Sequence, residues 1–260
     1  MKTDHFQEIP FGDVDPVITS LFDITKPTMP RAFNVLEGVT RGQILVDKPS
    51  NPTWACVRDG IYGTLYFGGQ VNALLIASLV EKFRQVGEVG IGCWLDDELN
   101  NIIPTDQDYD GRTLYFTECV PNTSLLDVKL PLGYTLEMRD QTLLKQSFDY
   151  ESTIDAFGSI ENVMRYTLSF DIMYEDKVVC EAATGAPTHG LIEVGVTTHE
   201  SHRQRGLAAI ACAHLIRACE ANGYKTWWDC AKQNTASVRL ARKLGYQNEH
   251  EYRYVWWKKK

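Results

Sequence analysis

The residues best suited to chemistry form one short run, Arg203-Gln204-Arg205-Gly206-Leu207-Ala208. A strand-like stretch precedes this run, and a helix-like pattern opens within it and runs on as AIACAHLIRACEANG. The first N–H groups of a helix lack partners within the helix and lie at the positive end of its dipole, so a helix start attracts anions. Two arginines add positive charge, and Gly206 lets the backbone approach a ligand closely. The run therefore predicts a cradle for a pyrophosphate.

A second polar group stands at the start of the last expected helix. Asn234 and Ser237 follow the strand-like stretch TWWDCA, and Gly245-Tyr246 end the helix. Asparagine is a favoured helix N-cap, so capping alone could explain Asn234. Asn234 also belongs to a longer series of elements: strand, RxxGxA turn, helix, strand and NxxS helix. This order indicates that Asn234 and the RxxGxA turn form one site.

The elements that must position these groups repeat along the chain. Alternating apolar residues predict strands at 42–47, 53–58, 61–67, 89–94, 112–117, 134–138, 167–174, 178–184, 191–197, 226–231 and 251–257. Helical patterns predict helices at 15–24, 29–38, 71–84, 96–100, 140–146, 152–157, 206–223 and 235–244. Residues 119–133, with two prolines and little periodicity, predict a linker. The order of elements is similar on its two sides, which indicates an internal structural repeat and an α/β or α+β fold with a mixed sheet.

Charge and length limit the kinds of partner. The chain has 260 residues and a net charge of −8. Residues 1–130 hold 18 acidic and 10 basic residues, whereas residues 131–260 hold 16 of each. An acidic balance argues against nucleic acid as a partner. The first residues, MKTDHFQEIPFGD, lack a signal-peptide core, and no apolar run reaches the ~18 residues of a membrane span, so a cytoplasmic protein without membrane contact is expected.

Neither metal binding nor cysteine chemistry is indicated. The acidic run 106–111 opens like a calcium loop, but position twelve of that loop is Thr117 instead of glutamate. The histidines show no converging metal spacing, so no metal site is predicted. The seven cysteines form no CxxC pair and are expected to be buried, reduced side chains.

Taken together, VGVTTHESHRQRGLA, QNTASVRLARKLGY and the order of elements between them resemble the GNAT superfamily of N-acetyltransferases. The resemblance covers residues 132–258, and the whole chain is similar to a bacterial subgroup in which a degenerate GNAT-like half precedes a working one. It implies a GNAT fold in two tandem halves, with a degenerate domain at 1–125 that binds no cofactor and an acetyltransferase domain at 132–260.

The same resemblance implies acetyl-CoA as acyl donor. Backbone N–H groups from Gln204 to Ala208 would hold its pyrophosphate, and the exposed backbone from Val194 to Thr198 would pair with its pantetheine arm. The expected cofactor-binding residues are Val194, Val196, Thr197, Thr198, Arg203, Gln204, Arg205, Gly206, Leu207, Ala208, Asn234 and Ser237.

Direct attack of an amine on the thioester needs a base and a proton for the leaving thiolate. Glu193 is the candidate base, acting through water, although a salt-bridged strand residue would look the same. The family's usual acid is a tyrosine after a leucine in the last helix, but here Leu240 is followed by Ala241. Tyr246 is then a candidate acid, with packing beneath the glycine turn as the alternative.

We therefore expect an N-acetyltransferase that moves an acetyl group from acetyl-CoA to a primary amine of a small molecule in a ternary complex. The alternative is an acetyl-CoA-binding sensor or an antibiotic-sequestering module without turnover. The identity of the amine, the existence of a dedicated acid, the role of the first half and a homodimer are left open by the sequence.

Overall fold

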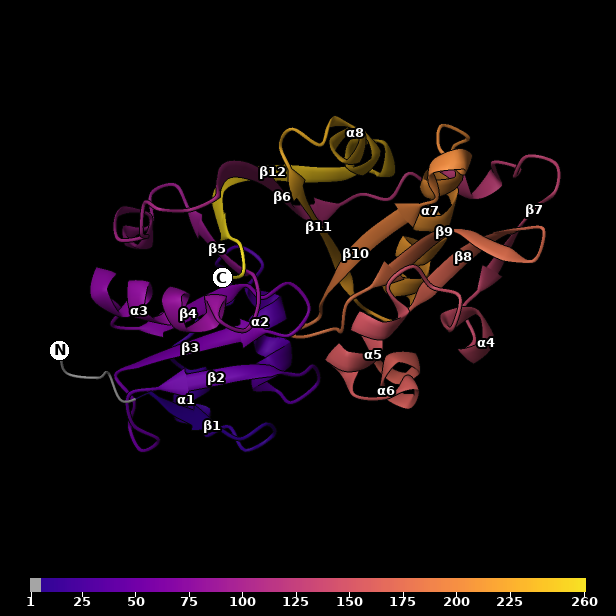
Figure 1. The fold of residues 1–260 in the computed structure, drawn as a ribbon. Coiled ribbons are helices and arrows are strands. Elements are labelled where there is room, and N and C mark those ends of the chain that lie inside the picture. The colour runs from indigo at the N-terminus through magenta and orange to yellow at the C-terminus, as the bar shows by residue number, and fades with distance from the viewer. Residues whose placement is uncertain (1–5) are drawn as a thin grey trace. The chain divides into compact units, whose positions relative to one another are not determined.

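A computed structural model describes residues 6–260 (Figure 1). The chain divides into two compact units. The first comprises the described residues up to Thr113 together with Glu251–Lys260, and the second is Leu114–His250. Strands β6 (Tyr109–Cys119) and β12 (Tyr246–Trp257) each pass from one unit into the other.

The first unit is a sheet with helices on both faces. Its antiparallel sheet has the order β1 (Gln7–Ile9), β2 (Gly42–Val46), β3 (Trp54–Asp59) and β4 (Leu65–Gly69). Helices α1 (Pro16–Thr19) and α2 (Met29–Leu36) pack on one face, and α3 (Ala73–Arg84) packs on the other, because side chains of β2 and β3 alternate between two apolar clusters. Strand β5 (Val89–Trp94) pairs antiparallel with the end of β12, and η1 (Glu98–Asn101) follows it.

The second unit carries the residues of interest. Its strands run in the order β12, β6, β11 (Lys225–Ala231), β10 (Leu191–Thr198), β9 (Lys177–Thr184), β8 (Ser169–Tyr174) and β7 (Tyr134–Met138). All neighbours from β7 to β10 are antiparallel, whereas β10 and β11 are parallel. The helices are η2 (Thr123–Asp127), α4 (Gln141–Leu144), α5 (Tyr150–Phe157), α6 (Ile160–Tyr166), η3 (Glu200–His202), α7 (Leu207–Ala221) and α8 (Thr235–Leu244).

Helix α7 anchors this unit. Its apolar residues, among them Ile210, Leu215 and Ile216, pack against side chains of β8, β9 and β10, such as Ile172 and Ile192. On the opposite face of the sheet, Glu181 of β9 accepts a hydrogen bond from the backbone N–H of Phe148 at 3.0 Å. The segment that leads from α4 to α5 therefore contacts the face that α7 does not cover.

Most expected elements are present, and the differences have local causes. Helix α6 was not predicted, although Ser159 caps it by accepting from the N–H of Asn162 at 3.1 Å. Strand β12 begins at Tyr246 instead of residue 251. Its first part, residues 247–250 (QNEH), is polar and exposed, so it lacks the apolar alternation by which a strand is predicted. Residues 119–133, expected as a linker, contain η2 and pack against α7 within the second unit. The domain limits 1–125 and 132–260 stay a prediction.

None of the helices in the described part of the chain is long and apolar enough to span a bilayer. Residues 1–5, which contributed to the expectation about targeting, lie outside the described residues.

Candidate active site

Strands β10 and β11 are paired at their beginnings and then separate. Their parallel pairing joins Leu191, Ile192 and Glu193 to residues 225–227 and ends there. Strand β10 continues to Thr198 but pairs only with β9 beyond this point, from Val194↔Thr184 to Thr198↔Cys180. This is the separation that the resemblance implied between the strand before the turn and its neighbour.

The backbone of β10 points its polar groups into that separation. Gly185 N–H donates to Glu193 O at 3.2 Å and His199 N–H donates to Val179 O at 2.8 Å, so the odd-numbered backbone groups of β10 face β9. Because these groups alternate along a strand, those of Val194, Val196 and Thr198 face the side of β11. An extended ligand with amide groups could pair with them as a further strand would.

The turn after β10 has the backbone form of an anion cradle. Gln204 (φ +63°) and Gly206 (φ +78°) are both left-handed, and Gly206 is the N-cap of α7 with no side-chain cap. Left-handed residues in such a turn direct successive N–H groups into one concavity, in addition to the uncapped N–H groups of the helix. A Cβ added to Gly206 would meet no atom within 4 Å, so no protein atom fills the space beside this glycine. The turn therefore has the uncapped N–H groups that a pyrophosphate cradle needs, and its role toward acetyl-CoA stays a prediction.

The corresponding turn of the first unit is closed by its own chain. Asn72 caps α3 by accepting from the N–H of Leu75 at 3.0 Å, which satisfies a helix donor. Gly69 N–H donates to Leu21 O at 3.2 Å, and a Cβ on Gly68 would lie 2.9 Å from that same oxygen. Leu21 thus takes the backbone position beside β4 that a ligand would take beside β10. This gives a physical reason for the expectation that the first half holds no cofactor.

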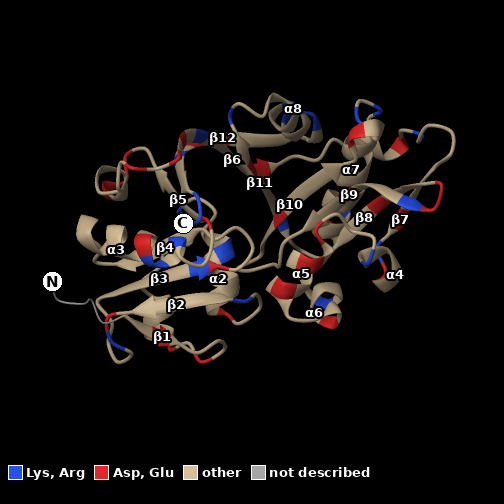
Figure 2. Ribbon diagram, in the orientation of Figure 1, with Lys and Arg blue, Asp and Glu red and all other residues tan. Residues whose placement is uncertain are grey.

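Two arginines of the cradle differ in their surroundings. The Nε of Arg203 donates to Thr198 O at 3.1 Å, so this side chain folds back and closes the turn against the end of β10. Arg205 is exposed. Blue segments in Figure 2 mark the basic residues of the loop before α7. Exposed cations beside a helix N-terminus add to its attraction for a phosphate group.

Asn234 and Ser237 are placed by the local fold of α8. Asn234 is the N-cap and accepts from Ser237 N–H at 3.2 Å, as the capping interpretation predicts. The hydroxyl of Ser237 accepts from the indole Nε1 of Trp228 at 3.1 Å. These bonds fix both side chains at the end of β11, and their role toward a cofactor stays a prediction.

Glu193 lies at the point where the two strands separate. It is half-buried, and its register partner in β11 is Trp227. Its side chain lies over Gly185, where an added Cβ would sit 3.8 Å from Oε2. Since Ile192 and Val194 point into the core beneath α7, Glu193 faces the opposite side of the sheet. A carboxylate there could take a proton from an amine through water, which stays a prediction.

Tyr246 is a core residue. It is 3% exposed and packs against Trp228 and Phe116, with ring centroids 5.6 and 6.4 Å away. Burial raises the pKa of its hydroxyl well above the usual value. Ala241 is fully buried in the same core. The surroundings favour the packing interpretation of Tyr246, and its role as a general acid stays an untested prediction.

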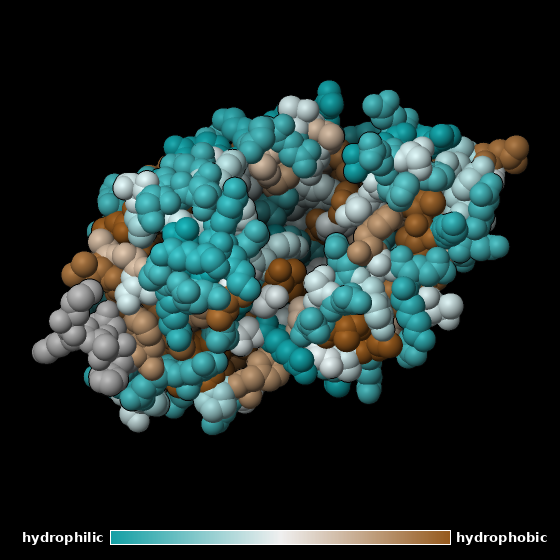
Figure 3. Space-filling view, viewed as in Figure 1, coloured by the Kyte–Doolittle hydropathy of each residue, from teal (hydrophilic) through white to brown (hydrophobic). Residues whose placement is uncertain are grey.

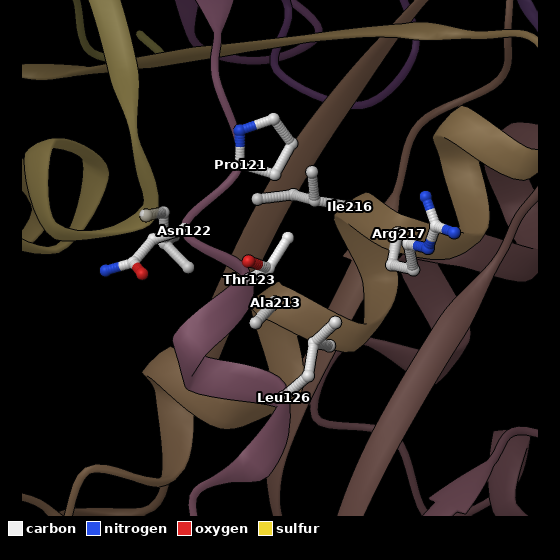
Figure 4. Close-up of a pocket in the computed structure, with 8 residues that line it drawn as sticks. Pro121, Asn122, Thr123, Leu126, Ala213, Ile216 and Arg217 are labelled. Carbon is white, nitrogen blue, oxygen red and sulfur yellow. The ribbon is translucent and has the colours of Figure 1, made fainter.

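The remaining features of the second unit do not add chemistry to this site. A small depression between η2 and α7 is lined by Pro121, Leu126, Ala213 and Ile216 among others, none of them from the cradle (Figure 4). Burial raises the pKa of the Cys180 thiol to about 11. No group of metal-ligating side chains was found among the described residues.

On the face seen in Figure 3, apolar residues (brown) form small groups among hydrophilic ones.

The sequence matches the family described as GNAT acetyltransferase over residues 20–255, which is nearly the whole chain. The chain belongs to this family. The expectation of a GNAT acyltransferase is thereby confirmed at the level of the family.

Individual relatives agree with the GNAT assignment. The Bacillus subtilis (strain 168) protein named "Uncharacterized N-acetyltransferase YdfB" is 26% identical over 159 residues, and the match spans only 60% of the length of each protein. A GCN5-related N-acetyltransferase-like protein from Streptococcus suis 89/1591 has a TM-score of 0.71 and 24% identity, with 92% of this chain and 96% of that chain covered. A tandem GNAT protein from the clavulanic acid biosynthesis pathway has a TM-score of 0.57 and 10% identity, with 98% and 99% covered. The two solved structures confirm the expected GNAT fold.

Two features of this GNAT site were missed by reasoning from the sequence. One is the bond from Arg203 to the end of β10. The other is the bond between the hydroxyl of Tyr134 and Nδ1 of His202, at 2.8 Å across 68 residues of sequence. The first bond joins residues five apart, within one turn, and could in principle have been expected from the sequence. The second has no signal in residue spacing, because its partners meet only when the strands pair.

Proposed function

We propose that this protein transfers the acetyl group of acetyl-CoA to a primary amine of a small molecule. The observation that carries the proposal is the separation of β10 from β11 after Glu193, followed at once by the left-handed turn at Gln204 and Gly206. A separated strand supplies amide partners for an extended arm, and the turn supplies N–H groups for the phosphates at the end of that arm.

The proposed contacts place acetyl-CoA along β10, from the turn at residues 203–208 back toward Glu193. Residues 203–208 hold the pyrophosphate, and the backbone of Val194, Val196 and Thr198 holds the pantetheine arm. Thr197, Asn234 and Ser237 are the remaining residues proposed to bind acetyl-CoA. Acetyl-CoA supplies an activated acyl group in the form of a thioester. The arm would thus place its reactive end near Glu193, where the two strands meet.

The reaction then needs little from the protein beyond positioning. The amine must be neutral to attack, so Glu193 takes its proton through a water molecule. The C–N bond forms, the C–S bond breaks, the nitrogen of the new amide gives its extra proton to solvent, and solvent protonates the leaving thiolate. Holding the amine next to the thioester supplies much of the rate, because a step between two molecules becomes a step within one complex.

Two measurements test this proposal. Calorimetry with acetyl-CoA should give one binding site per chain, since Leu21 closes the corresponding turn of the first unit. A free-thiol assay over a panel of small amines should then show CoA release that depends on one class of amine. Absence of binding at millimolar acetyl-CoA would overturn the proposal.

A second candidate function rests on the acid position. Ala241 is buried and carries no titratable group, and Tyr246 is enclosed by aromatic rings. A protein that binds acetyl-CoA as a sensor, or sequesters an aminated antibiotic, would need no acid. Binding of acetyl-CoA without thiol release on any amine of the panel would favour this second function.

A further inference from the structure

Three aromatic side chains meet beside the cradle from distant parts of the second unit. Tyr134 begins β7, Tyr174 ends β8, and His202 ends η3 directly before Arg203. The hydroxyl of Tyr134 lies 2.8 Å from Nδ1 of His202. Ring centroids are 4.7 Å apart for Tyr134 and Tyr174, 5.7 Å for Tyr134 and His202, and 5.2 Å for Tyr174 and His202. We call these three residues the aromatic clamp.

The clamp lies where the cradle needs support. All residues from Arg203 to Gly206 are exposed, so packing of their own side chains does little to fix them. Gln204 also holds a left-handed conformation, which is unfavourable for a residue with a Cβ and persists only when its surroundings impose it. The bond from Arg203 to Thr198 O ties the turn to the end of β10. His202 ties the same turn, one residue earlier, to the sheet edge formed by β7 and β8.

We propose that the aromatic clamp is a positioning device, which holds residues 203–206 in the anion-binding conformation before any ligand arrives. The inference rests on the proposed function for the identity of the ligand, but the conformation of the turn can be measured without one. A turn ordered in advance loses less entropy when it binds, so the clamp acts on affinity. It touches no reacting group and should leave the rate at saturation unchanged.

Tyr134→Phe is the sharpest perturbation, because it removes the hydroxyl bonded to His202 and keeps the ring. Tyr174→Phe is the matched control, since the contacts of Tyr174 within the clamp are made by its ring. His202→Phe removes the ring nitrogen that takes part in this bond and should have the effect of Tyr134→Phe. Because both changes remove one bond, the double variant should be affected no more than either single variant.

The rate of trypsin cleavage measures how well the turn is ordered in the absence of acetyl-CoA. Cleavage after Arg203 or Arg205, identified by mass spectrometry, should be about 3- to 10-fold faster in Tyr134→Phe than in the wild-type protein, the range expected when one net hydrogen bond is lost. Cleavage after Lys232, in the connection from β11 to α8, serves as the internal reference and should not change. Equal cleavage of the turn in both proteins would overturn the clamp, whatever the protein binds.

Binding and kinetics complete the test. Tyr134→Phe should raise the Kd and the KM for acetyl-CoA by about 3- to 10-fold and leave kcat and the KM for the amine unchanged, whereas Tyr174→Phe should match the wild type. A fall in kcat with unchanged KM for acetyl-CoA would contradict a positioning role. If the wild-type protein itself binds no acetyl-CoA, the proposed function fails while the trypsin result still decides on the clamp.

Discussion

Replacing Gly206 with alanine separates the stability of the cradle from its ability to bind. Gly206 has a φ of +78°, and a methyl group there would meet no protein atom within 4 Å. The variant is therefore not excluded by a clash. Its cost in the free energy of folding arises from the left-handed backbone alone, about 1–2 kcal/mol for a residue with a Cβ. For a protein of this size, each kcal/mol corresponds to a fall of about 2–4 °C in Tm.

The loss of binding should be larger than the loss of stability suggests. The methyl group would extend into the open space beside Gly206, next to the N–H groups that are proposed to hold the pyrophosphate. Keeping the phosphate away from even one backbone N–H forfeits a hydrogen bond to a charged group, about 1.5–3 kcal/mol. Since about 1.4 kcal/mol is a factor of ten, the Kd for acetyl-CoA should rise about 10- to 150-fold.

Helix α7 offers a matched control at its other end. Gly223 has a φ of +80° and likewise no atom within 4 Å of an added Cβ. Gly223→Ala should therefore lose a similar amount of stability and no affinity. Thermal unfolding and calorimetry with acetyl-CoA on the two variants give the comparison. The reasoning is refuted if Gly206→Ala binds like the wild-type protein, or if Gly223→Ala loses as much affinity as Gly206→Ala.

Three further predictions concern the proposed roles of single side chains. Glu193→Gln should lower kcat about 10²- to 10⁴-fold in initial-rate assays, because an amide cannot accept the proton of the amine, and should leave acetyl-CoA affinity unchanged; an unchanged kcat would remove Glu193 from the reaction. Arg205→Ala should weaken acetyl-CoA binding about 1.5- to 5-fold at low salt and have almost no effect at ~0.5 M salt, whereas Arg203→Ala should keep a residual effect at high salt because it also loses the bond to Thr198; identical salt curves for the two variants would contradict this difference. Tyr246→Phe should keep kcat within about twofold, because the hydroxyl is buried among aromatic rings and burial raises its pKa well above the pH of the assay. A 100-fold loss of kcat with normal affinity for acetyl-CoA would restore Tyr246 as the general acid.

The local part of the site could be predicted because it depends on neighbouring residues. Gly206 and the uncapped start of α7 belong to one turn, and the periodic apolar residues after it specify the helix. Asn234 was interpretable as a cap for the same reason, since a side chain that bonds the N–H three residues later needs no tertiary partner. Capping also could have revealed α6 through Ser159.

Other parts depend on partners far apart in the chain and could not be predicted. The end of the β10–β11 pairing at Glu193↔Trp227 is a matter of register between strands separated by a helix. The insertion of Leu21 beside Gly69 and the bond from Tyr134 to His202 likewise join distant segments. Whether Tyr246 faces a ligand or the core was also decided only by its packing against Phe116 and Trp228.

The sequence by itself determined the form of the uncapped helix start at Gly206 and the family to which its motifs belong. Both are properties of short runs, in which backbone conformation and hydrogen bonding are set within about one helical turn. Only the tertiary structure decided which backbone groups are left to bind and which are closed. Gly69 and Val196 are both strand residues before a helix, but the chain covers the first with Leu21 and leaves the second facing the separation from β11. That difference arises from how the strands and loops pack, because a backbone group can be closed only by a segment that folding brings beside it.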